Sequence, residues 1–533
     1  MSNSKFLKGA AILGISGVFV KVIGAVFRIP LTNWIGDEGM SFYGCAYPIY
    51  SFFLVISTAG IPVAISKMVA ERITVRNYGG AHKVFKVSLR LLTVLGVISF
   101  LLCYFGADII AGDLQNNPEA ASSLRAIAPA LLFVPIMSAF RGYFQGRQNM
   151  NPTAISELTE QTFRAAVGLS LAYSFLSVGL SEAAAGATFG ASAGSFAGMV
   201  IIAIIYLLNR KVIHVKIRRG KNDYEDSKEI LKKILIIAVP ITIGAAIMPI
   251  MSTIDSVVVM GRLEATGWTH EQAQSLYGQL SGYCGSLIGL PQIFTQAMAV
   301  SLVPAISSAF LRGDRNELQD NIQLGLRATL LIGFPCAVGL FVLAEPILLL
   351  LFASRPAEAI AAAPTLMVMA VGVVFLSTVQ TLTGALQGVG RQSVPVKNLA
   401  IGAVFKLVVT YVCVGIPALN VKGAAIGTIA AYLVATLLDF AAVKRYTRTR
   451  FDLKLTYIIP GAASLLMGAA AFAAYKLLYM VIESNTIATM LSILVAIPVY
   501  GILILLMKGI TKEEISKLPK GDKIVRFLGR LLR

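Results

Sequence analysis

Long apolar segments recur along almost the whole of this 533-residue chain. Each reaches about 20 residues, the length that lets a helix cross a lipid bilayer. Only 14% of the residues are charged, against roughly 25% in a soluble domain. We therefore predict an all-α integral membrane protein. Fourteen segments qualify as transmembrane helices, at residues 10–32, 42–65, 86–108, 124–144, 158–180, 184–208, 233–260, 276–304, 324–351, 359–387, 396–417, 421–443, 456–480 and 486–508.

The lysines and arginines give these segments an orientation. With the N-terminus in the cytoplasm, 37 of the 46 basic residues fall in cytoplasmic stretches, five in outer loops and four within the membrane. This asymmetry is the one that the positive-inside rule describes, and one segment more or fewer would destroy it. We predict a multi-pass protein of a bacterial plasma membrane with both termini in the cytoplasm. The net charge of +19 is then explained by loops on an anionic leaflet, not by binding of nucleic acid.

The chain also contains an internal repeat. The motif Gly142-x-x-Gln145-Gly146 recurs 242 residues later as Gly384-x-x-Gln387-Gly388, and Phe163-Arg164 recurs at the same offset as Phe405-Lys406. Two further similarities pair Gly186–Gly190 with Gly423–Gly427 and Pro62–Ser66 with Pro304–Ser307. Each repeat unit holds six segments, an even number, so both units keep the same orientation in the membrane. This pattern predicts two six-helix lobes related by a pseudo-two-fold axis along the membrane normal.

The repeat sets the predicted domain boundaries. Residues 1–208 form the N-terminal lobe, residues 209–232 a cytoplasmic linker and residues 233–444 the second lobe. Residues 445–508 hold two extra helices, and residues 509–533 form a basic cytoplasmic tail.

Four cations lie inside apolar segments, namely Lys21, Arg28, Arg164 and Lys406. Charge in the bilayer interior is costly, so such residues usually line a polar cavity or an ion path. Their common positive sign favours an anionic substrate. Arg28 lies near a predicted helix end, where its side chain could instead reach the outer interface. Arg164 and Lys406 occupy equivalent repeat positions, so we expect them to face each other between the lobes.

Acidic residues accompany two of the predicted helices. Glu157 and Glu160 share a helix face with Arg164, because spacings of three, four and seven residues bring side chains together. The group is either an ion-pair ladder at a helix end or a binding site in which the glutamates hold the arginine. Asp255 and Arg262 are seven residues apart. They could form a structural pair, act as a gate, or bind a coupling cation or proton.

The motifs of the common enzyme classes are missing. The sequence has no Walker motif, HExxH, GxSxG or divalent-metal cluster, and the five cysteines lack metal-site spacing. We predict no catalytic residue, no metal site and no cofactor. Transport would then be driven by substrate supply, by the membrane potential or by a gradient of protons or another monovalent cation.

Several local motifs resemble a known family. They are Lys21-Val-Ile-Gly24 through Arg28, the turn Ile35–Gly39, Tyr43-Gly44, Tyr47–Tyr50, Pro62–Lys67 and Arg141–Met150. Together they resemble the MurJ/SpoVB (YtgP-type) branch of the multidrug/oligosaccharidyl-lipid/polysaccharide exporter superfamily, along all fourteen segments. The resemblance implies a V-shaped central cavity between the lobes and a lipid-tail groove formed by the last two helices. It also implies a flippase that moves lipid II, a peptidoglycan precursor linked to undecaprenyl pyrophosphate, from the inner to the outer leaflet.

The same resemblance suggests roles and partners. Lys21 and Arg28 would contact the pyrophosphate, and the partners would be a lipid-linked glycan pyrophosphate, membrane lipids and a cell-wall polymerase. One departure concerns the eighth segment, where the stretch Tyr277–Tyr283 lacks the arginine that related proteins often carry. The alternatives are a flippase for another lipid-linked oligosaccharide or polysaccharide repeat unit, a cation-coupled multidrug antiporter, or a non-transporting scaffold in division or sporulation.

Overall fold

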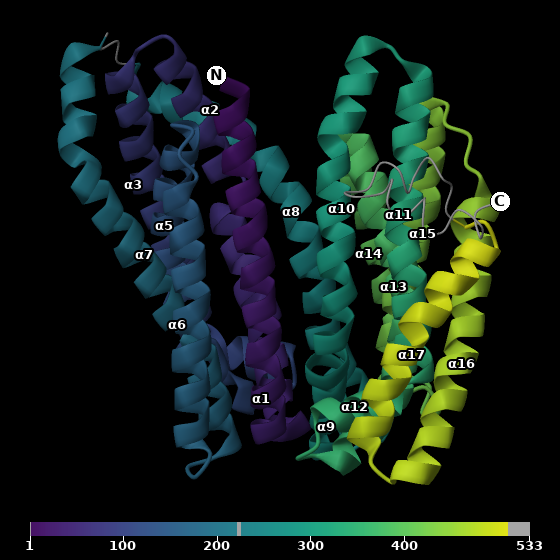
Figure 1. Cartoon of the computed structure of the whole chain (residues 1–533). Helices are drawn as coiled ribbons and strands as arrows, with labels where there is room; N and C mark the ends of the chain where they lie inside the picture. Colours follow the sequence, from purple (N-terminus) through teal and green to yellow (C-terminus); the bar gives the residue numbers. More distant parts are fainter. Residues whose placement is uncertain (1, 221–224, 510–533) are drawn as a thin grey trace. The chain divides into compact units, whose positions relative to one another are not determined.

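The computed structural model describes residues 2–220 and 225–509 of the chain. Every regular element in these two ranges is a helix, as predicted (Figure 1). Residue contacts divide the chain into two compact units that meet in sequence at Gly282 and Tyr283. Each unit has helices and buried apolar clusters of its own.

Unit 1 is built from helices α1 to α9. Their bounds are α1 Ser2–Thr58, α2 Ile61–Thr74, α3 Tyr78–Phe105, α4 Ala121–Ile127, α5 Ala130–Gly146, α6 Asn151–Phe175, α7 Leu180–Arg219, α8 Ser227–Glu264 and α9 His270–Gly278, with a π-helical turn at Ile109–Leu114 and a 3₁₀ turn at Pro118–Ala120. Helix α6 packs along α7, and α1 packs against both α6 and α8. Unit 1 therefore includes α8, whereas the predicted boundary assigns residues 233–444 to the second lobe. The lobe boundaries stay a prediction.

Unit 2 contains the remaining helices. Their bounds are α10 Gly285–Arg312, α11 Arg315–Val342, α12 Ala344–Leu351, α13 Pro356–Gly388, α14 Ser393–Val414, α15 Lys422–Thr447, α16 Ile459–Ile482 and α17 Asn485–Leu506, with a π-helical turn at Lys454–Ile458. Another π-helical turn, Gln279–Cys284, contains the boundary between the two units. Helix α14 packs along α15, and α13 contacts α10, α11 and α15. The extra pair α16 and α17 packs together and against α11 and α12.

Membrane-spanning character is clear from length and composition. Twelve helical stretches in the described part of the chain are long and apolar enough to cross a membrane. The first, Phe19–Thr74, has 56 residues and covers residues 19–32 of the first predicted segment and the whole of the second. Helix α6 covers most of the fifth segment but is absent from the twelve, because Glu157, Glu160 and Arg164 lower its hydropathy. The all-α membrane architecture is confirmed, and the number of fourteen crossings stays a prediction.

A sharp bend divides α1, the purple helix of Figure 1. Gly36 has φ 66° and ψ −166° inside an otherwise helical stretch. Only glycine adopts this conformation at little cost, because a Cβ atom would clash with the neighbouring backbone. The bend lies within the predicted Ile35–Gly39 turn and separates the part of α1 that carries Arg28 from the part that carries Tyr43.

Glycines bring equivalent helices close together in both units. In unit 1, a Cβ atom on Gly190 would lie 2.5 Å from the carbonyl oxygen of Arg164. In unit 2, a Cβ atom on Gly427 would lie 3.2 Å from the carbonyl oxygen of Lys406. Such small-residue contacts let membrane helices pack backbone to backbone. The pairs α6–α7 and α14–α15 thus share the packing that the repeat predicts.

Glu225 connects the start of α8 to α2 and α3 through ion pairs and a hydrogen bond. Its carboxylate lies 2.6 Å from Arg72 of α2 and 2.7 Å from Lys233 of α8, and Lys83 of α3 donates to its carbonyl oxygen. The hydrogen bond from Lys233, together with the charge of Arg72, holds the pKa of Glu225 below its usual value of 4.5. The carboxylate is therefore the form that the folded protein prefers.

We expect the contribution of Glu225 to depend on pH. A carboxyl group whose folded-state pKa is depressed stabilises the fold above its usual pKa, and that contribution is lost as the pH falls through the folded value. Glu225→Gln should lower the unfolding free energy by about 1 kcal/mol or less at neutral pH, because the cluster is partly exposed. Thermal unfolding of both proteins at neutral pH and well below pH 4.5 would test this. A difference that is equally large in acid would contradict it.

Candidate substrate-binding site

Arg164 of α6 is held by two tyrosines of α1. Its guanidinium group donates to the hydroxyl of Tyr43 over 3.1 Å and to that of Tyr47 over 3.4 Å. The guanidinium carbon also lies 5.0 Å from the centre of the Tyr47 ring, within the range of a cation–π contact. The two rings stack at 5.8 Å with only 9° between their planes. Tyrosines four residues apart on one helix face thus build a fixed support for the arginine.

Arg28 reaches the same tyrosines from the other side of the bend in α1. Its guanidinium carbon lies 5.7 Å from the centre of the Tyr43 ring. Arg28 and Arg164, two of the predicted binding cations, therefore share Tyr43. Among the described residues no carboxylate forms an ion pair with either of them. We call Arg28, Tyr43, Tyr47 and Arg164 the arginine–tyrosine cluster.

The glutamates of α6 have other partners than Arg164. Glu160 lies 2.9 Å from Arg141 of α5, whose Nε atom also donates to the hydroxyl of Ser156 over 2.9 Å. Glu157 accepts a hydrogen bond from Ser16 at 3.4 Å. The hypothesis that these glutamates hold Arg164 is therefore wrong, because the hydroxyls of Tyr43 and Tyr47 accept its hydrogen bonds. The role of the two glutamates in gating stays a prediction.

The Arg141–Glu160 pair should contribute substantially to stability. Its side chains are only 15% and 16% exposed, and breaking a largely buried ion pair costs roughly 3 kcal/mol. We expect Glu160→Gln to lower the unfolding free energy by most of that amount. The matched control is Glu71→Gln at the exposed Lys67–Glu71 pair, where a change below about 1 kcal/mol is expected. Equal losses in the two variants, measured by thermal unfolding in detergent, would contradict the assignment.

The other two predicted cations, Lys21 and Lys406, differ from each other in their exposure. Lys21 lies on α1, two helical turns before Arg28, and is exposed. Lys406 lies on α14 of unit 2 and is only 3% exposed. A lysine so deeply enclosed in a membrane helix is unusual, and its role in substrate binding stays a prediction. The predicted approach of Lys406 to Arg164 stays a prediction.

Asp255 and Arg262 both lie on α8 of unit 1 and are half-buried. Asp255 lies within electrostatic range of Tyr277 of α9. The choice between a structural pair, a gate and a cation site for these two residues stays open.

Asp37 of α1 forms a second polar contact, with α9 and the turn that follows it. The carboxylate of Asp37, next to the bend, accepts hydrogen bonds from the hydroxyl of Ser275 and, over 3.1 Å, from the amide of Gln279. The Tyr277 hydroxyl donates to the carbonyl oxygen of Gly44 over 3.0 Å. Sequence reasoning noted that this stretch lacks an arginine but did not identify Asp37 as its partner. The side chains of this stretch that the structure places on Asp37 are thus the neutral Ser275 and Gln279.

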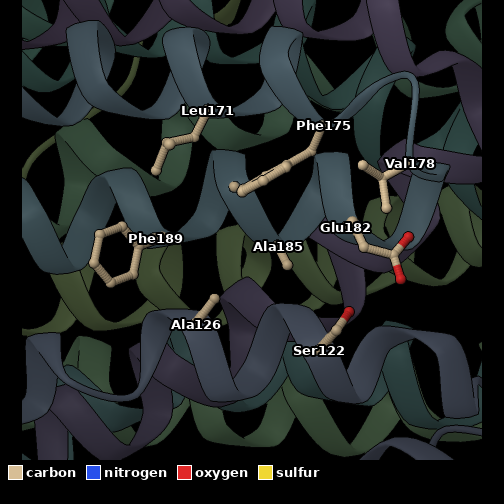
Figure 2. Close-up of a pocket in the computed structure, with 9 residues that line it drawn as sticks. Ser122, Ala126, Leu171, Phe175, Val178, Glu182, Ala185 and Phe189 are labelled. Carbon is tan, nitrogen blue, oxygen red and sulfur yellow. The ribbon is translucent and has the colours of Figure 1, made fainter.

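A pocket of about 430 Å³ lies among α4, α6 and α7 (Figure 2). Its walls are apolar, with the rings of Phe175 and Phe189 prominent in the view. The charged group in the lining is Glu182, whose carboxylate lies at one end. An acidic rim disfavours phosphate, so this pocket does not suit an anionic head group.

The described part of the chain contains no cluster of three or more His, Cys, Asp or Glu side chains that could hold a metal ion.

Comparison with known proteins places the chain in a family. Residues 6–310, more than half of its length, match the family model described as polysaccharide biosynthesis protein, and residues 281–412 match the MatE model. Among curated proteins, stage V sporulation protein B of Bacillus subtilis is 28% identical over 100% of both chains. Lipid II flippase MurJ of Bacillus subtilis is 28% identical over 83% of each chain.

Solved structures show the same fold. A lipid II flippase MurJ in an inward closed conformation superimposes with a TM-score of 0.67 at 16% identity, covering 97% of this chain and 99% of the other. An inward-facing multidrug resistance MATE family transporter gives 0.69 at 18% identity, covering 82% and 98%. These relatives are transporters, not enzymes. The chain therefore belongs to the polysaccharide biosynthesis protein family and is a multi-pass MurJ/SpoVB-like flippase of the multidrug/oligosaccharidyl-lipid/polysaccharide superfamily.

Proposed function

We propose that this protein moves an undecaprenyl-pyrophosphate-linked glycan, with lipid II as the first candidate, from the inner to the outer leaflet by alternating access. The observation that carries the proposal is the arginine–tyrosine cluster, which presents two guanidinium groups without carboxylate partners among the described residues. Its relatives include a protein named lipid II flippase MurJ.

The chemistry of the cluster suits a pyrophosphate. A guanidinium group has five N–H donors, and Arg164 uses two bonds to reach Tyr43 and Tyr47. The remaining donors can form paired hydrogen bonds with phosphate oxygens, an arrangement in which arginine is stronger than lysine. The tyrosine hydroxyls accept from Arg164 and keep their own protons for donation to the ligand. The stacked rings hold both arginines in place before the substrate arrives, so little entropy is lost on binding.

The direction of transport fits an anionic head group. A bacterial plasma membrane is negative inside, and outward movement of negative charge is favoured by about 2.3 kcal/mol per charge per 100 mV. The membrane potential alone could thus drive the outward step. Lys21 and Lys406 are the further cations that we propose for the path, and the groove formed by α16 and α17 would take the lipid tail.

Two alternatives differ in the substrate. A multidrug antiporter for cationic compounds would need acids at its binding site, and the arginine–tyrosine cluster has none among the described residues. A flippase for a different lipid-linked glycan remains the second candidate, favoured by the absence of an arginine from the stretch Tyr277–Tyr283.

The test is the exposure of lipid II in the outer leaflet of cells depleted of their own flippase. We expect the wild-type chain to restore exposure and Arg28→Ala to lose most of it at equal membrane levels. The matched control is Arg125→Ala, which removes an arginine of unit 1 that pairs with Asp108 outside the cluster. Restoration by all three proteins would contradict the cationic site. Well-expressed wild-type protein that restores nothing would move the proposal to another lipid-linked glycan.

A further inference from the structure

Asp439 of α15 is a carboxylic acid enclosed within unit 2. Its side chain is 0% exposed. One oxygen, Oδ1, accepts a hydrogen bond of 2.7 Å from the amide of Asn398 on α14, and the hydroxyl of Thr383 on α13 is the other polar group beside it. The second oxygen, Oδ2, is buried and has no hydrogen-bond partner within the described residues. A buried carboxylate in this setting is unfavourable while it stays charged, because no cation in the described part of the chain compensates for its lost hydration.

The charged groups on the packed helices do not compensate this carboxylate. On α14, Lys406 lies two helical turns beyond Asn398, on the order of 12 Å away at a rise of about 1.5 Å per residue. On α11, the buried Arg327 donates to the carbonyl oxygen of Gly509. Lys397 of α14 and Lys444 of α15 are exposed. Helix α13 contributes the neutral Thr383.

The repeat reveals what unit 2 lacks. Thr383 precedes the Gly384 motif just as Arg141 precedes the Gly142 motif, and Asn398 lies at the same 242-residue offset from Ser156. In unit 1, Arg141 binds Ser156 and is neutralised by Glu160. Unit 2 keeps a carboxyl group in the corresponding polar core but replaces the arginine with threonine.

The position of Asp439 does not itself require an acid. Gly190 contacts the backbone of Arg164, and Gly427 contacts that of Lys406. Twelve residues further along each helix lie Ile202 and Asp439. Both are 0% exposed, so the same place in unit 1 is filled by an apolar side chain. An isoleucine fills this place in unit 1, so close packing does not require an acid. The acid in unit 2 therefore indicates a function.

We propose that Asp439 is a proton-binding site of unit 2, which takes up a proton at Oδ2 and releases it to water during the transport cycle. The step is balanced: the carboxylate and one proton form a carboxylic acid, and no electron moves. A proton needs no added space, so it fits a fully enclosed side chain. The neutral acid keeps its bond from Asn398 and no longer carries an uncompensated charge.

Proton binding at Asp439 would change how the α14–α15 helix pair holds an anion. With Asp439 charged, its field opposes that of Lys406 at an anion bound nearby, and with Asp439 neutral, this opposing field is removed. The helix rise puts Asn398 about 12 Å from Lys406, and puts Asp439 about 18 Å from Gly427, the residue packed on Lys406. Over roughly 12 to 18 Å at an effective dielectric constant near 20, the difference corresponds to about a five- to tenfold change in affinity for one negative charge. This second step rests on the proposed function, whereas the proton site itself does not.

The proton site is tested without substrate by infrared difference spectroscopy of the full-length protein in lipid, between acidic and alkaline buffer. We expect a carboxylic acid C=O band in the wild type that is missing in Asp439→Asn. The matched control is Thr436→Val, which removes a buried hydroxyl of the same helix and should keep the band. Asn398→Ser, which installs the unit 1 residue, should shift the titration of the band. Identical difference spectra for wild type and Asp439→Asn would overturn the proposal.

Two further measurements separate the possible failures. In proteoliposomes with lipid II, the wild-type flipping rate should vary about five- to tenfold with pH, and the rate of Asp439→Asn should not. If the wild type moves no lipid II at any pH, the substrate assignment fails while the infrared result still decides the proton site. Thermal stabilisation by sodium over potassium that disappears in Asp439→Asn would also overturn the proposal, in favour of a metal cation.

Discussion

Replacing Arg164 with alanine is expected to slow flipping by at least about 100-fold. Hydrogen bonds to charged groups contribute about 1.5–3 kcal/mol each, and the loss of two such bonds to a phosphate corresponds to a factor of roughly 150 or more. Arg164 has the most specific geometry of the predicted cations, because Tyr43 and Tyr47 fix its guanidinium group from α1. The measurement is the initial rate of lipid II exposure in proteoliposomes at matched protein content.

Companion variants show whether the loss comes from the lost charge or from disturbed packing. Arg164→Lys keeps the charge but removes paired donation, so an intermediate rate is expected. Tyr43→Phe keeps the ring beside Arg28 but removes the 3.1 Å bond to Arg164, and we expect a loss of about tenfold. Should Arg164→Ala retain the wild-type rate while Arg125→Ala loses it, the arginine–tyrosine cluster would not be the binding site.

Replacing Gly278 with alanine is expected to disrupt the contact between α1 and α9. A Cβ atom at this position would lie 1.7 Å from the carbonyl oxygen of Asp37, so the two backbones would have to move apart. That movement would break the bonds of Asp37 with Ser275 and Gln279. Overpacking against backbone costs about 3 kcal/mol or more. We expect a clear fall in the thermal unfolding midpoint and in the yield of folded protein.

The matched control is another glycine in a helix of the same chain. A Cβ atom on Gly289 of α10 would meet no atom within 4 Å. Gly289→Ala should therefore be neutral or stabilise the protein by up to about 1 kcal/mol, through the higher helix propensity of alanine. A Gly278→Ala protein that unfolds at the wild-type temperature would show that α1 and α9 do not approach each other so closely.

The membrane architecture and the family could be predicted from the sequence, and α6 shows where such prediction weakens. Apolar length alone identifies most helices, because each must satisfy its own backbone hydrogen bonds in lipid. Residues 158–180 were predicted as the fifth segment, but the charged residues of α6 keep this helix out of the twelve apolar stretches of the structure. The repeat gives independent support, because it relates Arg164 of α6 to Lys406 of α14. The bend at Gly36 was predicted as a turn in the Ile35–Gly39 stretch, and the structure confirms a break there.

The sequence by itself determined the class of protein and the presence of cations inside apolar segments, from which an anionic substrate is predicted, because hydropathy, charge and repeats are local properties of the chain. Which residues pair was decided only by the tertiary structure. Glu160 lies one helical turn from Arg164 yet binds Arg141 of α5, and Arg164 binds tyrosines more than one hundred residues away in the sequence. The isolated carboxyl group of Asp439 likewise emerges only when α13, α14 and α15 are packed. The sequence shows which residues are charged, but the packing of the helices decides which partner each charge has. The partner in turn determines the free-energy cost of burying the charge and the function that it can serve.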